Sequence, residues 1–305
     1  MKELKGNRLV SAFSDLRAAG KKALVPFITA GYPDLETTEA LLRDFESRGV
    51  RICELGIPFS DPIADGPVIQ ASYTEALAAG ITSDRIFEMV RRYRGSMSRD
   101  GSTGSPQGGS SGLTAGRKGA GAVSRDRKGA GGLALVAMVS YSIIYRHGVE
   151  DYLAATREAG FDGLIVPDLP LEEAAQFEQL AAGNGLANVM LMAPTTPPQR
   201  RLRIAGHSKG FIYFISVAGI TGERAKLPEE SIAAVAELRK HTSTPICIGF
   251  GISNPATVRH VCEVADGAIV GSAIVHRVTD AKDMPREKLV GRVGDFVSEL
   301  LAPIA

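Results

Sequence analysis

The sequence contains few cysteines and almost no excess charge of either sign. Its three cysteines, Cys53, Cys247 and Cys262, are an odd number in a chain of 305 residues and form no CxxC pair, which argues against a disulfide framework and against a zinc site. The 35 basic residues nearly balance the 34 acidic ones, so the formal net charge is +1. A chain with this balance has no overall field that would attract nucleic acid or an anionic membrane, and we expect neither as a partner.

Long apolar runs are also missing. No stretch of 18 apolar residues suggests a membrane span, and residues 1–14 are interrupted by Lys2, Glu3, Lys5 and Arg8, which excludes the apolar core of a signal peptide. We therefore expect a cytoplasmic protein, and a reducing compartment suits its unpaired cysteines. The 44% hydrophobic content and the mean hydropathy of +0.03 leave ample apolar surface for a sizeable core.

Apolar, β-branched runs alternate with amphipathic stretches along the chain. The runs that predict strands are 23–29, 50–55, 133–139, 163–166, 188–192, 211–215, 245–249 and 267–270. The stretches that predict helices are 37–47, 85–93, 149–159, 172–182, 229–241 and 255–264. Eight strand runs that alternate with helical stretches predict an α/β fold of the (β/α)8 TIM-barrel type, with residues 1–305 as a single domain. An open, doubly wound sheet is the alternative, but the residues that carry chemistry all follow strands, as in barrel enzymes.

Two segments depart from this alternation. A helical pattern at 67–79 follows the second strand and predicts an extra helix. Residues 95–132 are rich in Gly and Ser and repeat Arg-Lys-Gly-Ala-Gly, so we expect a disordered, low-complexity insertion before the third strand. Such an insertion would leave the barrel at its bottom face, away from the active-site loops. Its basic residues are interpreted as a solvated linker, although contact with an anionic partner is an alternative.

The loop after the second predicted strand holds several carboxylates. Glu54 closes an apolar run, so we expect it to point into the barrel mouth, where burial would raise its pKa toward that of a usable general acid. Gly and Pro residues fold the following loop and would bring Asp65 over the same pocket. The alternative is that Glu54 pairs with a barrel neighbour while Asp61 and Asp65 only cap turns. Residue types alone leave both interpretations open.

The order Glu-Leu-Gly-Ile-Pro-Phe-Ser-Asp-Pro-x-Ala-Asp-Gly-Pro at 54–67 closely resembles the signature of the tryptophan synthase alpha chain family. The resemblance runs from Val-Pro-Phe-Ile-Thr at 25–29 to Gly-Ser-Ala-Ile-Val at 271–275, with the Gly/Ser-rich insertion as the exception. It implies a lyase of L-tryptophan biosynthesis that cleaves indole-3-glycerol phosphate to indole and glyceraldehyde 3-phosphate by a retro-aldol reaction. It also implies that Glu54 is the general acid and base and that Asp65 handles the indole nitrogen proton.

This cleavage requires no metal and no organic cofactor, because two carboxyl groups can supply the proton transfers and the charge stabilisation. A lysine Schiff base is the mechanistic alternative. No lysine stands at the end of a predicted strand, which counts against that alternative. The five histidines show no metal-ligand spacing and are interpreted as surface or helix-end residues.

Tyr213 lies inside the sixth predicted strand. Core packing is the plainer interpretation of a tyrosine in an apolar strand. The resemblance places Tyr213 beside the substrate, near the catalytic carboxylates, and likens the following loop, with Gly219, Thr221 and Gly222, to a mobile flap. Closure of such a flap would exclude water.

Gly- and Ser-rich loops follow the last two strands, where barrels commonly bind phosphate. We expect Gly251, Gly271 and Ser272, with Gly222 from the flap and Ser253 as an additional member, to cradle the substrate phosphate. Each loop alone is more simply a plain turn.

The indole ring needs apolar walls, for which Phe27, Thr29 and Ile69 are the candidates, although core packing explains Phe27 equally well. Asp168 follows the fourth strand and is expected to orient a neighbour rather than to react.

The resemblance implies a beta chain as partner, in an alpha2-beta2 tetramer. Ser142 stands where the family often has Asn after an aromatic residue, which puts the communication between subunits in doubt. Two other functions remain open: a different phosphosugar barrel enzyme, and a non-catalytic regulatory barrel that only binds a partner. Different residues at the strand ends would favour the first, and phosphate-ester binding without turnover would favour the second.

Overall fold

The computed structural model describes residues 4–62, 65–99, 132–216, 228–249 and 251–305. Eight parallel strands form a closed barrel in chain order, and β1 pairs with β8 from Ala23 beside Gly267 to Pro26 beside Val270. The strands are β1 (Ala23–Thr29), β2 (Ile52–Gly56), β3 (Ala134–Met138), β4 (Gly163–Ile165), β5 (Ala187–Met192), β6 (Ile212–Ile215), β7 (Ile246–Gly249) and β8 (Gly267–Val270). The predicted barrel is confirmed, and the open sheet is wrong because closure leaves no edge strand.

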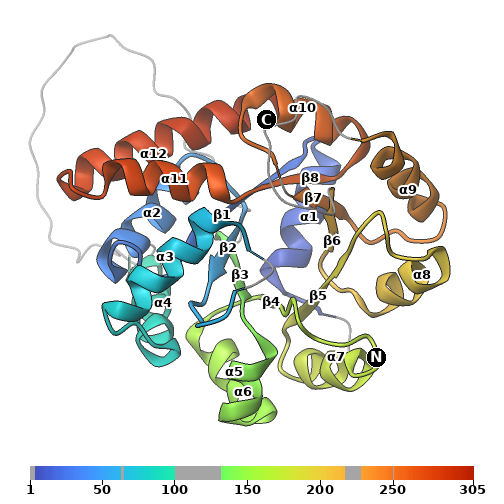
Figure 1. Ribbon diagram of the computed structural model, residues 1–305, viewed down its shortest axis with the longest axis horizontal. Coiled ribbons are helices and arrows are strands. Elements are labelled where there is room, and N and C mark those ends of the chain that lie inside the picture. The colour runs from blue at the N-terminus through green and yellow to red at the C-terminus, as the bar shows by residue number, and fades with distance from the viewer. Residues whose placement is uncertain (1–3, 63–64, 100–131, 217–227, 250) are drawn as a thin grey trace, which may run out of the picture.

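Helices surround the barrel as a ring (Figure 1). They are α1 (Arg8–Ala18), α2 (Leu35–Ser47), α3 (Pro67–Ala78), α4 (Ser83–Arg99), α5 (Tyr141–His147), α6 (Val149–Ala159), α7 (Ala174–Gly183), α8 (Pro198–His207), α9 (Glu229–Arg239), α10 (Pro255–Val264), α11 (Ser272–Ala281) and α12 (Arg286–Leu301), followed by the short 3-10 helix η1 (Ala302–Ile304). The extra helix predicted after the second strand is α3. Helices α1, α5, α8, α11 and α12 were not predicted by the apolar spacing. No helix in the described ranges is long and apolar enough to cross a membrane.

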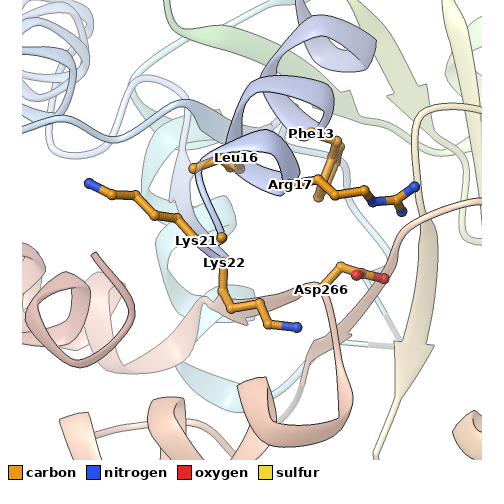
Figure 2. A pocket seen from close by; sticks show the side chains of 7 residues that line it. Phe13, Leu16, Arg17, Lys21, Lys22 and Asp266 are labelled. Atoms are coloured by element: carbon orange, nitrogen blue, oxygen red, sulfur yellow. The ribbon is translucent and has the colours of Figure 1, made fainter.

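Helix α1 covers the N-terminal opening of the barrel. Asn7 caps this helix, because its side chain accepts from the backbone N–H of Leu9, and the same side chain donates to the carbonyl oxygens of Asp162 and Gly185, just before β4 and β5. The ring of Phe13 packs on Phe211, just before β6, at 5.7 Å between centroids. Between the end of α1 and Asp266, a cavity of about 150 Å³ opens at this bottom face (Figure 2).

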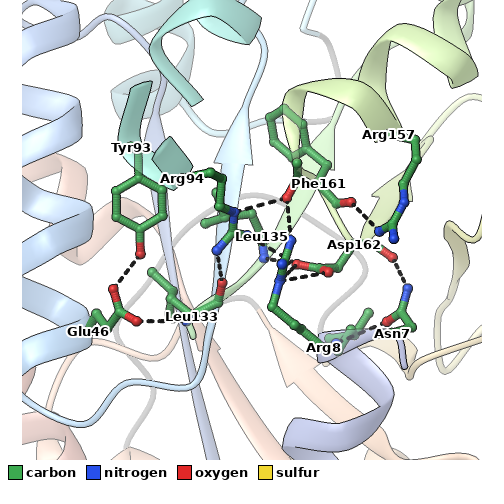
Figure 3. A network of polar contacts seen from close by, with 12 residues as sticks. Asn7, Arg8, Glu46, Tyr93, Arg94, Leu133, Leu135, Arg157, Phe161 and Asp162 are labelled. Atoms are coloured by element: carbon green, nitrogen blue, oxygen red, sulfur yellow. Dashed lines mark hydrogen bonds and ion pairs between the residues drawn. The ribbon is translucent and has the colours of Figure 1, made fainter. Parts of the chain in front are cut away.

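A polar network joins α1, α4 and the starts of β3 and β4 at the same end (Figure 3). Asp162 is almost fully buried, and its carboxylate lies 3.2 Å from Arg94 Nη2 and 3.0 Å from Arg8 Nε, while it accepts the Leu135 N–H at 3.0 Å. Arg94 Nη1 also donates to the carbonyl oxygen of Leu133 at 2.8 Å. These bonds tie the end of α4 to the start of β3.

The predicted start of the insertion at residue 95 is wrong, because α4 continues to Arg99. Its last part is held by contacts: Ser96 donates to the carbonyl oxygen of Tyr93 at 2.9 Å and accepts from Arg43. Residues 100–131 of the insertion lie outside the described residues, so their disorder stays a prediction.

Candidate active site

Glu54 lies on β2 at the centre of the barrel mouth. The strand pairing sets it beside Phe27 of β1 and Val136 of β3, and its side chain is 0% exposed. Neither carboxyl oxygen has a hydrogen-bond partner among the described residues. Burial, followed by the charge of Asp65, raises the pKa of Glu54 well above its ordinary value. The alternative in which Glu54 pairs with a barrel neighbour is therefore wrong.

Asp65 approaches the same pocket from the loop after β2. Its backbone N–H donates to the carbonyl oxygen of Pro62 at 3.0 Å, and Gln70 of α3 donates to the carbonyl oxygen of Asp65 at 2.7 Å, so the loop is folded back onto the helix. Burial raises the pKa of Asp65 to about 6. The charge of Asp65 contributes to the raised pKa of Glu54, which is the direction expected if the loop turns Asp65 toward the same pocket. Asp61 is exposed and accepts a hydrogen bond from Ser60, which fits a local turn role.

Tyr213 lies on β6, and its side chain is directed over Gly249 of β7. A Cβ built on Gly249 would lie 2.6 Å from the Tyr213 hydroxyl, so the glycine leaves the space that this phenol fills. Burial raises the pKa of Tyr213 well above its ordinary value, with further contributions from the charges of Glu54 and then Asp65. The phenol is therefore a neutral hydrogen-bond donor within the field of both carboxylates.

The three expected walls of the indole pocket gather where β1, α3 and β8 meet. A Cβ on Gly271 would lie 3.6 Å from both Phe27 and Ile69, so these two side chains share one space beside the end of β8. The Thr29 hydroxyl is bonded to Ser72 of α3 at 2.7 Å. This contact ties α3 to β1 and engages the Thr29 hydroxyl.

The glycines and serines predicted to hold phosphate follow β7 and β8. Gly251 has a φ of +76°, which favours glycine, and Ser253 precedes α10. Gly271 and Ser272 form the start of α11, where no side chain caps the helix. The Ile274 N–H donates to the carbonyl oxygen of Gly271 at 2.8 Å, which leaves the N–H groups of Ser272 and Ala273 available to an anion. Gly222 and the rest of the expected flap lie outside the described residues.

Asp168 orients the loop after β3, as its position predicted. It accepts hydrogen bonds from the Ser140 hydroxyl at 2.7 Å and from the Tyr141 N–H at 2.8 Å at the start of α5. The Ser140 hydroxyl is also 2.8 Å from that of Ser142, which is exposed on α5. Within the described part of the chain, no group of His, Cys, Asp or Glu side chains is arranged to hold a metal ion.

The sequence pattern did not identify one residue of the barrel mouth. Tyr73 on α3 is fully buried, and a Cβ on Gly56 would lie 2.5 Å from its hydroxyl. In the sequence, Tyr73 belongs to the apolar face of a predicted helix, where a tyrosine looks like ordinary core. Only the docking of α3 reveals that its phenol points to the strand that carries Glu54.

The cavity at the bottom face carries no comparable chemistry. Two of its polar groups have structural partners: Lys22 donates to the carbonyl oxygen of Ala265 at 2.8 Å, and Asp266 pairs with Arg239 at 2.9 Å. The cavity lies at the opposite end of the barrel from Glu54. In barrel enzymes this bottom face contributes to stability, and the active site lies at the other face.

The comparisons with known proteins agree with this geometry. The family model for the tryptophan synthase alpha chain matches residues 13–99 and 122–300. A tryptophan synthase alpha chain from Rhodopirellula baltica is 42% identical over 299 residues, which is 96% of each chain, and one from Geotalea daltonii is 39% identical over 98% of this chain and 99% of its own.

Solved structures superpose over nearly the whole length. The tryptophan synthase subunit alpha from Legionella pneumophila has a TM-score of 0.78 at 30% identity and covers 98% of both chains. A tryptophan synthase structure from Mycobacterium tuberculosis has a TM-score of 0.78 at 27% identity and covers 98% of this chain and 99% of its own. The alternative of a different phosphosugar barrel enzyme is therefore wrong. The chain belongs to the tryptophan synthase alpha chain family, and it is a lyase of tryptophan biosynthesis that cleaves indole-3-glycerol phosphate to indole and glyceraldehyde 3-phosphate.

Proposed function

We propose that Glu54 and Asp65 carry out this cleavage in opposite protonation states. The pKa of Glu54, raised well above its ordinary value by burial and by Asp65, supports a protonated acid near neutral pH. The pKa of Asp65, raised to about 6, supports an ionised carboxylate at the same pH. Two neighbouring carboxyl groups whose environments separate their pKa values can divide the acid role and the anion role between them. The observation that carries the proposal is the position of Glu54, which is 0% exposed in the barrel mouth and has no hydrogen-bond partner for either carboxyl oxygen among the described residues.

The reaction then needs only these two groups. Glu54 donates its proton to C3 of the indole ring, and the Asp65 carboxylate stabilises the positive N–H of the resulting indoleninium ion. The Glu54 carboxylate next accepts the proton of the glycerol hydroxyl as the C–C bond breaks. The electron pair of that bond returns to the ring to give indole, and the hydroxyl carbon becomes the aldehyde of glyceraldehyde 3-phosphate. Glu54 is protonated again at the end of the cycle.

The remaining site residues bind and orient the substrate in this proposal. Tyr213 donates a hydrogen bond near the carboxylates, and its buried position beside Gly249 supports that role. The apolar wall of Phe27, Thr29 and Ile69 holds the ring. The phosphate lies against the residues that follow β7 and β8 and the flap, namely Gly251, Ser253, Gly271, Ser272 and Gly222; the uncapped start of α11 supports this placement.

We further propose that the chain works in the cytoplasm and binds a tryptophan synthase beta chain as an alpha2-beta2 tetramer. The family supports this partner, because related structures are described as tryptophan synthase. Helix α5 presents Tyr145 with 71% of its surface exposed, next to Ser142, at the mouth end of the barrel. Co-purification with a beta chain, followed by measurement of the molar mass of the complex, tests the stoichiometry.

Indole release from indole-3-glycerol phosphate tests the residue roles. Glu54→Gln and Asp65→Asn should each lower the rate by about 10²–10⁴-fold, as expected for loss of a general acid or a stabilising charge. Asp61→Asn, an exposed carboxylate in the same loop, is the matched control and should retain the rate of the isolated chain. Activity at the control level in either variant would remove that residue from its role.

A further inference from the structure

The phenol of Tyr73 is a buried donor that the proposed reaction has not used. The side chain is 0% exposed, and its hydroxyl has no hydrogen-bond partner among the described residues. A Cβ built on Gly56 would lie 2.5 Å from this hydroxyl and 2.5 Å from Cζ of Phe27. The phenol therefore lies in the barrel mouth, over β2 and two residues beyond Glu54.

The position of Tyr73 is fixed from two sides. Its neighbour Ser72 bonds to Thr29 of β1 at 2.7 Å and also donates to the carbonyl oxygen of Ile69 at 2.7 Å, which holds this turn of α3 on the barrel. The ring of Phe59 packs on the ring of Tyr73 with centroids 5.6 Å apart. A buried hydroxyl that is held in place without an acceptor is unfavourable unless another state of the site supplies one.

The loop that carries Asp65 lies on the part of α3 that carries Tyr73, because Phe59 packs on Tyr73 with ring centroids 5.6 Å apart and Gln70 donates to the carbonyl oxygen of Asp65 at 2.7 Å. Burial raises the pKa of Tyr73 well above its ordinary value, with the charge of Asp65 contributing more than that of Glu54. For Tyr213 the order of the two carboxylates is reversed, with Glu54 before Asp65. The order of these contributions agrees with the packing of the loop on α3 and favours Asp65 as the acceptor.

We infer that Tyr73 is a positioning residue whose phenol donates a hydrogen bond to the ionised Asp65 carboxylate during the reaction and holds it toward the indole N–H. The inference rests on the proposed role of Asp65. The hydrogen stays on the phenol oxygen and no covalent bond changes. A hydrogen bond to a carboxylate favours its ionised form, so the phenol keeps Asp65 charged inside a partly dehydrated pocket.

Tyr73→Phe removes the hydroxyl and keeps the ring. We expect kcat/KM for indole release to fall about tenfold, the scale of a hydrogen bond to a charged group. The acid limb of the kcat profile, which reports the substrate complex, should move to higher pH, because the ionised form of Asp65 loses a donor there and its pKa rises. Tyr152→Phe is the matched control, since Tyr152 is a buried tyrosine of α6 outside the mouth. It should leave both the rate and the acid limb unchanged.

The double variant Asp65→Asn with Tyr73→Phe tests whether Tyr73 acts through Asp65, and the single variants distinguish a failure of this inference from a failure of the proposed function. If Tyr73 acts through Asp65, the double variant should be no slower than Asp65→Asn alone. A further tenfold loss would show an independent action and overturn the inference. A lower Tm in Tyr73→Phe with unchanged kcat/KM and an unmoved acid limb would also overturn it and leave the proposed function intact. Wild-type activity in Asp65→Asn would instead defeat the proposed function, and the inference with it.

Discussion

Two buried carboxylates lie at opposite ends of the same barrel, and their surroundings are opposite. Asp162 at the bottom is 1% exposed and is met by Arg8, Arg94 and the Leu135 N–H (Figure 3). Glu54 in the mouth is 0% exposed, and neither of its oxygens has a partner within the described ranges. A buried carboxylate is stable as an anion only where cations and N–H groups meet it.

The comparison separates stability from chemistry along the barrel axis. At the bottom, paired charges join α1, α4, β3 and β4, so that end resists opening. In the mouth, the unpartnered carboxyl group of Glu54 is expected to lower the stability of the fold, and in the proposed mechanism it holds the proton that is given to the substrate. Under that mechanism, the residue that weakens this barrel is also one that the reaction uses.

The largest effect on stability is expected at Asp162. Asp162→Ala leaves Arg94 and the Leu135 N–H without their partner in a buried place, which should lower the free energy of unfolding by about 3–5 kcal/mol. Urea titration followed by circular dichroism measures the change. Glu172→Ala removes an exposed partner of Arg200 and serves as the control, with no measurable change expected. Equal effects of the two substitutions would contradict the structural role of the bottom network.

A substitution in the barrel mouth is expected to change the free energy of unfolding in the opposite direction. Glu54→Leu replaces an unpartnered buried carboxyl group with an apolar side chain, which should raise the free energy of unfolding by about 1–2 kcal/mol while indole release is lost. The same urea titration and the indole assay measure both quantities. A loss of stability in this variant would mean that Glu54 is paired in the folded protein, and the contrast between the two ends would disappear.

A smaller effect is expected in the pH dependence of stability at Asp65. Its pKa rises from an ordinary 3.8 to about 6 on folding, so the folded state binds a proton between these values that the unfolded state releases. The contribution of Asp65 to the free energy of unfolding is therefore fully present below about pH 3.8 and is lost as the pH rises through about 6. The free energy of unfolding, measured from pH 4 to 7, should therefore fall less steeply with rising pH in Asp65→Asn than in the wild type. Asp61→Asn should keep the wild-type slope, and equal slopes for all three proteins would contradict the burial of Asp65.

The sequence predicted the parts of this molecule that depend on local pattern. Strand β1 was predicted at its observed bounds because its seven residues are all apolar or β-branched and all buried. Glu54 was singled out because it closes such a run, but its expected role came from the resemblance of residues 54–67 to the family signature. Tyr73 was missed because its environment depends on the Thr29 to Ser72 bond between β1 and α3, which no local pattern records. The length of α4 was missed for the same reason, since contacts with Arg43 and Leu133 support a helix end that contains Gly95.

The smallest effect is expected from the insertion. Arg94 donates to the carbonyl oxygen of Leu133 at 2.8 Å, and Glu46 accepts the Leu133 N–H at 3.2 Å, so the chain on either side of the segment is held by the barrel itself. If residues 100–131 are an unstructured connection, deletion of 108–123 halves its length and should raise the free energy of unfolding by only about 0.6 kcal/mol. Indole release should not change, because the segment leaves the barrel at the end opposite Glu54. A fall in kcat/KM without a change in stability would show that the bottom face acts on the mouth, and the separation of stability from chemistry would then be incomplete.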